Sequence, residues 1–433
     1  MYRIILLLIL STLLLSSCTS KKEISNEKDY HKYMQDGLIK KEAEKSVLEI
    51  NFWENRLQKD TGSYVNMLEL AINYLSLFKH TGKIAYLNTG DSLLKRSSAK
   101  LNNTNPEILF SLTQNSITQH NFIQAANYTA AAKKLDADMY TIRLLEFDTF
   151  MELGKYKEAI SSLKTVKDKL SFDYLVRMAK WEDHSGNLEA AIELMETAFK
   201  KIKEKNKSLY CWTLSNLGDM YGHAGRIEDA YHAYLNVLKK DPSNLYCLKG
   251  IAWITYSHDN KTKEAKEILK FILSQIEMPD LKLVLAEIAE TEGDIKTKQD
   301  LLLEFITDVT KPGYGDMYNK YLIKIYAEEL KNPDVALVLA TKELNNRFTP
   351  QTCDGIAWAY YNKGDKEKAF EYSRGYVNKY TFEPEALLHS AFIYADNGKK
   401  SEAIALFKKC LESEFELGPI AVSQIKSKLS DLQ

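Results

Sequence analysis

The sequence predicts an all-α solenoid, an α-α superhelix of about ten helical hairpins closed by a C-terminal capping helix. Apolar residues recur at three- and four-residue spacing, which is the period of one helix face. The whole pattern returns about every 34 residues between about residue 64 and residue 417. A repeat of this length is typical of hairpins that stack and share one core. An alanine marks the same position of the repeat at Ala125, Ala159, Ala191, Ala230, Ala265, Ala336, Ala369 and Ala403.

Glycine stands five residues before this position in six copies, where a chain that leaves a helix commonly adopts a left-handed conformation. One weaker copy, near residues 279–312, keeps the glycine but carries Lys298 in place of the alanine. We expect Lys298 either to extend its ammonium group to solvent along an apolar stem or to mark an opened hairpin. The six glycines are Gly154, Gly186, Gly225, Gly293, Gly364 and Gly398.

The clearest copy spans residues 211–244 and resembles the tetratricopeptide repeat. The resemblance implies a superhelix whose first helices line a concave groove. It departs from the family at Val237, where the family prefers alanine. The family pattern is met, counting Cys211 as position 1, by Leu214, Leu217, Gly218, Tyr221, Ala230, Tyr234 and Pro242.

The N-terminal residues read as a processing signal. Arg3 precedes an apolar or hydroxylated run at residues 4–15 that is too short to span a bilayer. The following Leu-Ser-Ser-Cys at 15–18 resembles the bacterial lipoprotein box, which implies cleavage before Cys18 and acylation of its thiol. An ordinary secretory signal with a chance cysteine is the alternative. Thr19 is not the aspartate that marks inner-membrane retention, so the resemblance favours a lipid-anchored protein of the bacterial cell envelope, at the outer membrane.

Four segments follow from these signals. Residues 1–17 form the signal peptide, and residues 18–62 hold the lipidated cysteine, a polar tether of about 25 residues and an N-terminal capping helix. Residues 63–417 form the repeat array. Residues 418–433 form the C-terminal capping helix, in which Pro419 occupies a helix start.

Composition excludes several classes of function. The formal net charge of −1, from 58 basic and 59 acidic residues, argues against nucleic acid as a partner. No motif for catalysis, a cofactor or a metal is present, so the sequence predicts a protein that is not an enzyme. His184, His223 and His258 lie near first-helix ends, where they either cap carbonyl groups or line one edge of the solenoid. The cysteines Cys211, Cys247, Cys353 and Cys410 read as apolar fillers, with a Cys211–Cys247 disulfide left open.

A second stripe on the first helices carries large aromatic and charged residues. In the family this stripe faces the groove, and aromatic rings with single charges are typical of binding hot spots. Packing between neighbouring repeats is the alternative use of such rings. Chaperone-binding members of the family carry a clamp of lysines and asparagines for a terminal carboxylate on this groove, but the clamp positions here hold Ser215 and Asp219, so recognition of an acidic C-terminal tail would have to use other residues. The candidate groove residues are Trp212, Asp219, Tyr246, Lys249, Trp253, Tyr256, Trp358 and Tyr361, with Phe392 beside the last two.

Together these features predict a membrane-tethered scaffold that binds a peptide or protein in its groove and needs no cofactor. A surface glycan-binding lipoprotein of a nutrient-uptake system is the alternative, although the repeats leave few loops for a sugar site. An enzyme within residues 276–319, where the repeat weakens around Gly313 and Gly315, has no nucleophile and base to offer.

Overall fold

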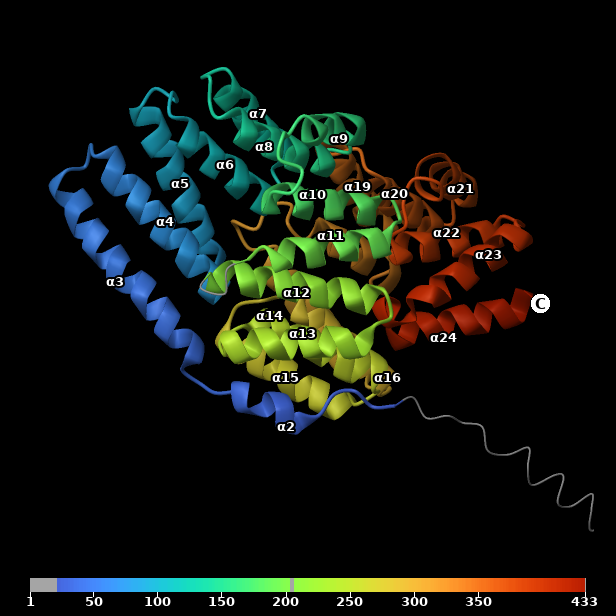
Figure 1. Ribbon diagram of the computed structural model, residues 1–433. Helices are drawn as coiled ribbons and strands as arrows, with labels where there is room; N and C mark the ends of the chain where they lie inside the picture. The colour runs from blue at the N-terminus through green and yellow to red at the C-terminus, as the bar shows by residue number, and fades with distance from the viewer. Residues whose placement is uncertain (1–21, 203–205, 433) are drawn as a thin grey trace, which may run out of the picture.

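The computed structural model describes residues 22–202 and 206–432, and within that part the secondary structure is entirely helical, with ten hairpins in succession (Figure 1). The predicted solenoid of about ten hairpins is therefore confirmed. The signal peptide and Cys18 lie outside the described residues. The first five hairpins are α4 (Tyr64–Thr81) with α5 (Ile84–Lys100), α6 (Pro106–Thr118) with α7 (Phe122–Lys133), α8 (Met139–Glu152) with α9 (Tyr156–Lys164), α10 (Phe172–His184) with α11 (Leu188–Lys200), and α12 (Lys207–His223) with α13 (Ile227–Lys240).

In three of the last five hairpins one helix ends in a π-helical turn, labelled η2 (Ile254–His258), η3 (Ile325–Glu329) and η4 (Ser373–Val377). The hairpins are α14 (Leu245–Trp253) and η2 with α15 (Thr262–Gln275), α16 (Leu281–Thr291) with α17 (Ile295–Val309), α18 (Asn319–Lys324) and η3 with α19 (Pro333–Asn346), α20 (Pro350–Lys363) with α21 (Lys366–Tyr372) and η4, and α22 (Pro384–Asp396) with α23 (Lys400–Cys410).

The repeated alanine is buried within each hairpin that carries it. All eight alanines are 0% exposed, as expected for a small residue packed between the two helices of a hairpin. The six predicted turn glycines all have positive φ, between 72° at Gly225 and 87° at Gly364. First helices of successive hairpins, such as α12 and α14, also contact each other. The first helices therefore line the inner side of the curve.

Lys298 follows neither of the two expectations. Its side chain is only 12% exposed, and its Nζ lies 2.8 Å from a carboxylate oxygen of Glu290 and 2.8 Å from one of Glu329. Burial alone would lower the pKa of Lys298, but the hydrogen bonds to Glu290 and Glu329 outweigh it and raise the pKa. The missing alanine is thus replaced by an ion pair that joins α17 to the two neighbouring first helices, and the hairpin stays closed.

Both ends of the array carry additional helices. The long helix α3 (Leu38–Lys59) covers α4, and α24 (Glu414–Leu432) follows a short turn, η5 (Leu411–Ser413). At Gly418 the backbone is non-helical, with φ 80°, so Pro419 begins the last helical run. Residues expected in the solvated tether are instead folded: α2 (Glu27–Tyr30) and η1 (His31–Tyr33) bury Tyr30 and Tyr33 to 3% and 8% exposure. Two tyrosines supply the apolar area that this polar segment otherwise lacks.

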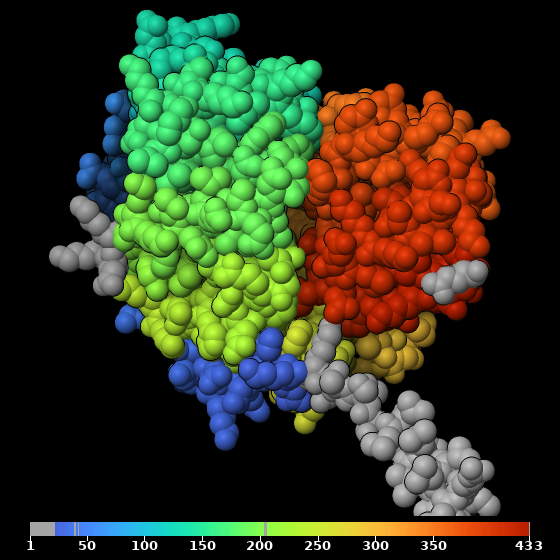
Figure 2. Space-filling view, turned by 45° about the vertical axis from the view of Figure 1, so that its right-hand side comes forward, coloured from blue at the N-terminus to red at the C-terminus, as the bar shows by residue number. Residues whose placement is uncertain are grey.

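The superhelix closes on itself, and this feature lies beyond the repeat pattern. Hairpin turns of the first half contact loops of the second half, with the backbone nitrogen of Glu277 donating to Thr81 O at 2.9 Å and Asn346 Nδ2 donating to His120 O at 2.8 Å. At Gly154 the approach is so close that a Cβ atom would lie 1.9 Å from the carbonyl oxygen of Phe348. Figure 2 shows the two halves side by side, green against orange and red, with a narrow cleft between them.

None of the helices in the described part of the chain combines the length and the apolar character that crossing a bilayer requires.

Candidate binding groove

Two of the predicted groove residues present large aromatic surfaces to solvent. Trp212 on α12 and Tyr246 on α14 are each 47% exposed and occupy equivalent places on consecutive first helices. Phe172, the first residue of α10, lies beside them, with its ring centroid 6.1 Å from that of Trp212. We call Phe172, Trp212 and Tyr246 the aromatic edge. Phe172 was missed in the sequence because it stands one repeat position before the others.

The charged candidates near the aromatic edge are engaged within the protein. The carboxylate of Asp219 accepts hydrogen bonds from the hydroxyl groups of Tyr246 and of Tyr234, the latter at 2.6 Å. Burial raises the pKa of Asp219, although these two hydrogen bonds oppose the rise. Lys249 donates to Asp280 at 2.7 Å, which links α14 to α16. These contacts hold neighbouring first helices in register, so they set the orientation of the exposed rings.

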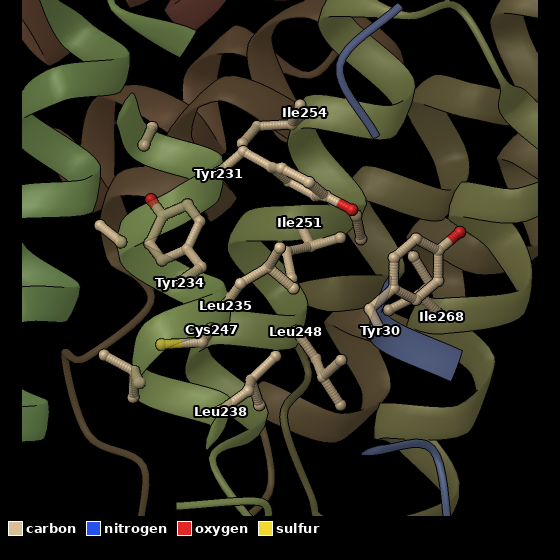
Figure 3. Close-up of a cluster of buried hydrophobic side chains, with 14 of the residues drawn as sticks. Tyr30, Tyr231, Tyr234, Leu235, Leu238, Cys247, Leu248, Ile251, Ile254 and Ile268 are labelled. Carbon is tan, nitrogen blue, oxygen red and sulfur yellow. The ribbon is translucent and has the colours of Figure 1, made fainter. Parts of the chain in front are cut away.

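Trp253 and Tyr256 lie deeper and join parts of the protein. Trp253 Nε1 donates to the carbonyl oxygen of Phe415 at 2.9 Å, so the tryptophan fastens α14 to the start of α24. Tyr256 is 1% exposed, and its hydroxyl donates to Glu287 at 3.1 Å. Burial raises the pKa of Glu287 to about 7. The expectation that Tyr256 contacts a ligand is therefore wrong, because its ring is buried in the hydrophobic core that also holds Tyr234 and Ile254. Figure 3 shows part of this core.

Trp358 and Tyr361, the last two predicted groove residues, pack inside the protein. Trp358 is 8% exposed and lies between two parallel rings, with Tyr361 at 4.8 Å on one side and His389 at 4.0 Å on the other. Its Nε1 donates to Glu328 at 2.6 Å, and Tyr361 donates to Asp396 at 3.1 Å. Because both faces of the indole are covered, Trp358 offers no stacking surface. Phe392 completes this packing, with its centroid 6.3 Å from that of Trp358.

Charged groups surround a cavity of about 70 Å³ beside Trp358. Lys324 donates to Glu385 at 2.7 Å, and the charges of Lys324 and Lys320 hold the pKa of Glu385 below its usual range despite burial. His389 pairs with Asp354 at 2.8 Å. Burial alone would lower the pKa of His389, but Asp354 outweighs it and raises the pKa. The space suits about two water molecules. The ion pairs around it tie α18, α20 and α22 together.

The remaining candidates have structural partners. The four described cysteines are free and buried, so Cys211 and Cys247 form no disulfide. The three histidines have contacts within the protein: the ring of His184 lies against Tyr156 with centroids 4.1 Å apart, His223 lies 3.9 Å from Glu416, and His258 lies 2.7 Å from Asp259. His223 and His258 also line one surface cavity. Within residues 22–202 and 206–432, no three His, Cys, Asp or Glu side chains are placed to hold a metal ion.

Comparison with known proteins identifies repeats of one family. The tetratricopeptide repeat profile matches residues 355–381 and 384–416, which coincide with the hairpins of α20 and α22. Comparison with curated proteins returns no match. Tetratricopeptide repeats generally form non-catalytic scaffolds for protein interaction, and the chain contains such repeats.

Several solved structures match part or most of this chain at low sequence identity. The human IFIT1 dimer with PPP-AAAA is 14% identical, with 75% of this chain and 76% of that chain covered and a TM-score of 0.46. A tetratricopeptide repeat protein of Parabacteroides merdae is 17% identical, with 60% and 98% covered and a TM-score of 0.35. Yeast Tom70 is 13% identical, with 93% and 96% covered and a TM-score of 0.34.

Proposed function

We propose that this protein is a membrane-tethered scaffold of the bacterial envelope that binds an extended peptide or a protein surface against the aromatic edge. The observation that supports this site is the exposure of Trp212 and Tyr246, each 47%, on consecutive first helices. Such rings bury much apolar area on binding and lose little rotamer entropy. The other aromatic candidates, Trp253, Tyr256, Trp358 and Tyr361, pack against other parts of the protein. Recognition through the aromatic edge requires no cofactor.

The double substitution Trp212→Ala and Tyr246→Ala should weaken partner binding at least about tenfold, because truncating one aromatic hot spot typically costs about 2 kcal/mol. The measurement starts with a photo-reactive amino acid at position 212, which identifies the partner by cross-linking in the native envelope. The affinity of that purified partner is then measured for the unaltered and the doubly substituted protein.

A matched control is available on another surface of the same chain. Phe348 and Tyr380 are 54% and 57% exposed, so the pair Phe348→Ala and Tyr380→Ala removes a similar aromatic area. This control should leave the affinity unchanged. Equal losses in the two double variants, or no loss in the first, would contradict the assignment of the binding site to the aromatic edge.

The tether is tested separately at Cys18. The unaltered protein should sediment with membranes and carry labelled fatty acid, because two or more buried acyl chains bind a bilayer stably. Cys18→Ser should abolish the labelling and release the protein into the soluble fraction. Thr19→Ser provides a conservative control next to the same site and should behave like the unaltered protein. Labelling that persists in Cys18→Ser, or an unlabelled wild-type chain, would refute the lipid tether.

A further inference from the structure

Residues 24–33 form an N-terminal strap that is fastened to the middle of the superhelix. The backbone nitrogen atoms of Ile24 and Ser25 donate to the carboxylate of Asp259 at 3.0 Å and 2.7 Å, and Ser25 Oγ donates at 2.5 Å. The Asp259 side chain is 0% exposed. A buried carboxylate that loses these donors pays a large desolvation cost, so the attachment is strong.

Further contacts extend the attachment along the strap. The hydroxyl group of Tyr231 on α13 accepts from the backbone nitrogen of Asn26 at 3.0 Å, and Lys261 donates to Ser25 O at 3.2 Å. Tyr30 enters the core beside Ile268 of α15, as Figure 3 shows. The chain is therefore fixed from residue 24 onward, on the side of the molecule formed by α13 and α15.

The distance from Cys18 to the strap is short. Cys18 and Ile24 are six positions apart in the sequence, and an extended chain spans at most about 3.5 Å per residue, which gives about 20 Å. A free tether of all residues from 19 to 43 would reach about 80 Å. A compact chain of this length has a radius of gyration of about 22 Å. With the strap in place, the reach is shorter than the molecule is wide.

We propose that the surface formed by the strap, α13 and α15 lies directly against the phospholipid bilayer. The inference rests on the proposed acylation of Cys18, and it adds which face the membrane contacts. Figure 1 shows α2 beside α13 and α15 at one end of the molecule and α7 and α9 at the opposite end. An anchored chain cannot turn the α9 end toward the lipid unless the strap is released.

Surface charge does not direct this orientation. The strap, α13 and α15 together carry seven lysines and six acidic residues, so this surface has no large excess of positive charge to attract anionic lipid. The tether alone selects the face, and the orientation is the same on neutral and on anionic vesicles. The exposed lysines are Lys28, Lys32, Lys239, Lys240, Lys263 and Lys270, the exposed acidic residues are Glu27, Glu228, Asp229 and Glu267, and Asp29, Glu264 and Lys266 are half-buried.

Energy transfer from a fluorophore on the protein to a headgroup acceptor tests the orientation. The acylated full-length protein is reconstituted in phosphatidylcholine vesicles with the fluorophore at Lys263→Cys, which lies on α15, or at Lys157→Cys, which lies on α9. The native described cysteines are buried, so the introduced thiol is labelled preferentially. Transfer should be several-fold more efficient from position 263 than from position 157, and adding phosphatidylglycerol should not change the ratio.

Two further variants vary the reach itself. A 20-residue Gly/Ser insertion after Thr19 adds about 25 Å of average reach, and Ser25→Ala with Tyr231→Phe loosens the strap without a large loss of core volume. Both variants should make the transfer efficiency from position 157 similar to that from position 263. Thr297→Ala, on the exposed start of α17, is the matched control and should keep them apart.

The outcomes separate this inference from the proposal on which it rests. Mass spectrometry of the N-terminal peptide reports whether Cys18 carries acyl chains. Equal transfer from positions 263 and 157 in protein with acylated Cys18 overturns the orientation alone. A ratio that the 20-residue insertion leaves unchanged also overturns it. Absence of acyl chains on Cys18 overturns the tether and the orientation together.

Discussion

Gly154→Ala should separate the two halves of the superhelix at this point and lower its stability by at least about 2 kcal/mol. An alanine at positive φ costs about 1–2 kcal/mol by itself. The new Cβ would also lie 1.9 Å from the carbonyl oxygen of Phe348, and a backbone atom cannot rotate away as a side chain can. Overpacking of this kind adds about 1–3 kcal/mol. Denaturant unfolding measures the stability, and small-angle scattering should show an increased radius of gyration.

Gly364→Ala isolates the contribution of the backbone conformation. Gly364 also ends a helix with positive φ, 87° against 75° at Gly154, but a Cβ at Gly364 meets nothing within 4 Å. This variant should lose about 1–2 kcal/mol and keep its radius of gyration. If the two variants unfold at the same denaturant concentration and scatter alike, the close approach at Phe348 does not hold the halves together.

Gly218→Ala should be destabilising although alanine favours helix. Replacing glycine within a helix gains about 1 kcal/mol of propensity. At Gly218, however, the Cβ would lie 2.5 Å from Cε1 of Tyr234. The ring cannot move aside, because its opposite edge meets the backbone at Gly250 and its hydroxyl donates to Asp219 at 2.6 Å. We expect a net loss of about 1–2 kcal/mol in the free energy of unfolding.

Gly355→Ala, in helix α20, should instead increase the free energy of unfolding. The nearest atom to a Cβ there is Cδ1 of Ile323 at 3.6 Å, an ordinary van der Waals distance. The propensity gain of about 1 kcal/mol should then appear as increased stability. The comparison of the two glycines by denaturant unfolding is informative in either direction: if Gly218→Ala stabilises as much as Gly355→Ala, Tyr234 is not clamped between the backbones of α12 and α14.

The hairpins could be predicted from the sequence because each rests on contacts within one repeat. Ala230 and Gly225 contact residues of the same hairpin, so their spacing in the sequence reflects the local geometry. Closure of the superhelix joins residues such as Glu277 and Thr81, which belong to different repeats and follow no period. Gly154 illustrates the difference: its positive φ was predictable, whereas the approach of Phe348 depends on the accumulated rotation of several hairpins.

The candidate site could be predicted only in part, for a related reason. The helical period places Trp212, Trp253 and Trp358 on the same stripe of their repeats. What covers each ring comes from elsewhere in the chain: Phe415 reaches Trp253 across the closed superhelix, and His389 covers Trp358 from the next repeat. Trp212 stays exposed, and the repeat pattern gives no sign of this difference.

The strap also constrains the order in which the protein folds. Ser25 and Asp259 are 234 residues apart in the chain, and a chain delivered from its N-terminus presents the strap long before the sixth hairpin exists. Contacts between such distant segments form slowly, because the loop between them must first be closed. Tyr30 and Tyr33 are therefore not yet buried in the core while the first five hairpins assemble. Attachment of the strap is expected to be a late step, detectable as delayed hydrogen-exchange protection at Ile24 and Ser25.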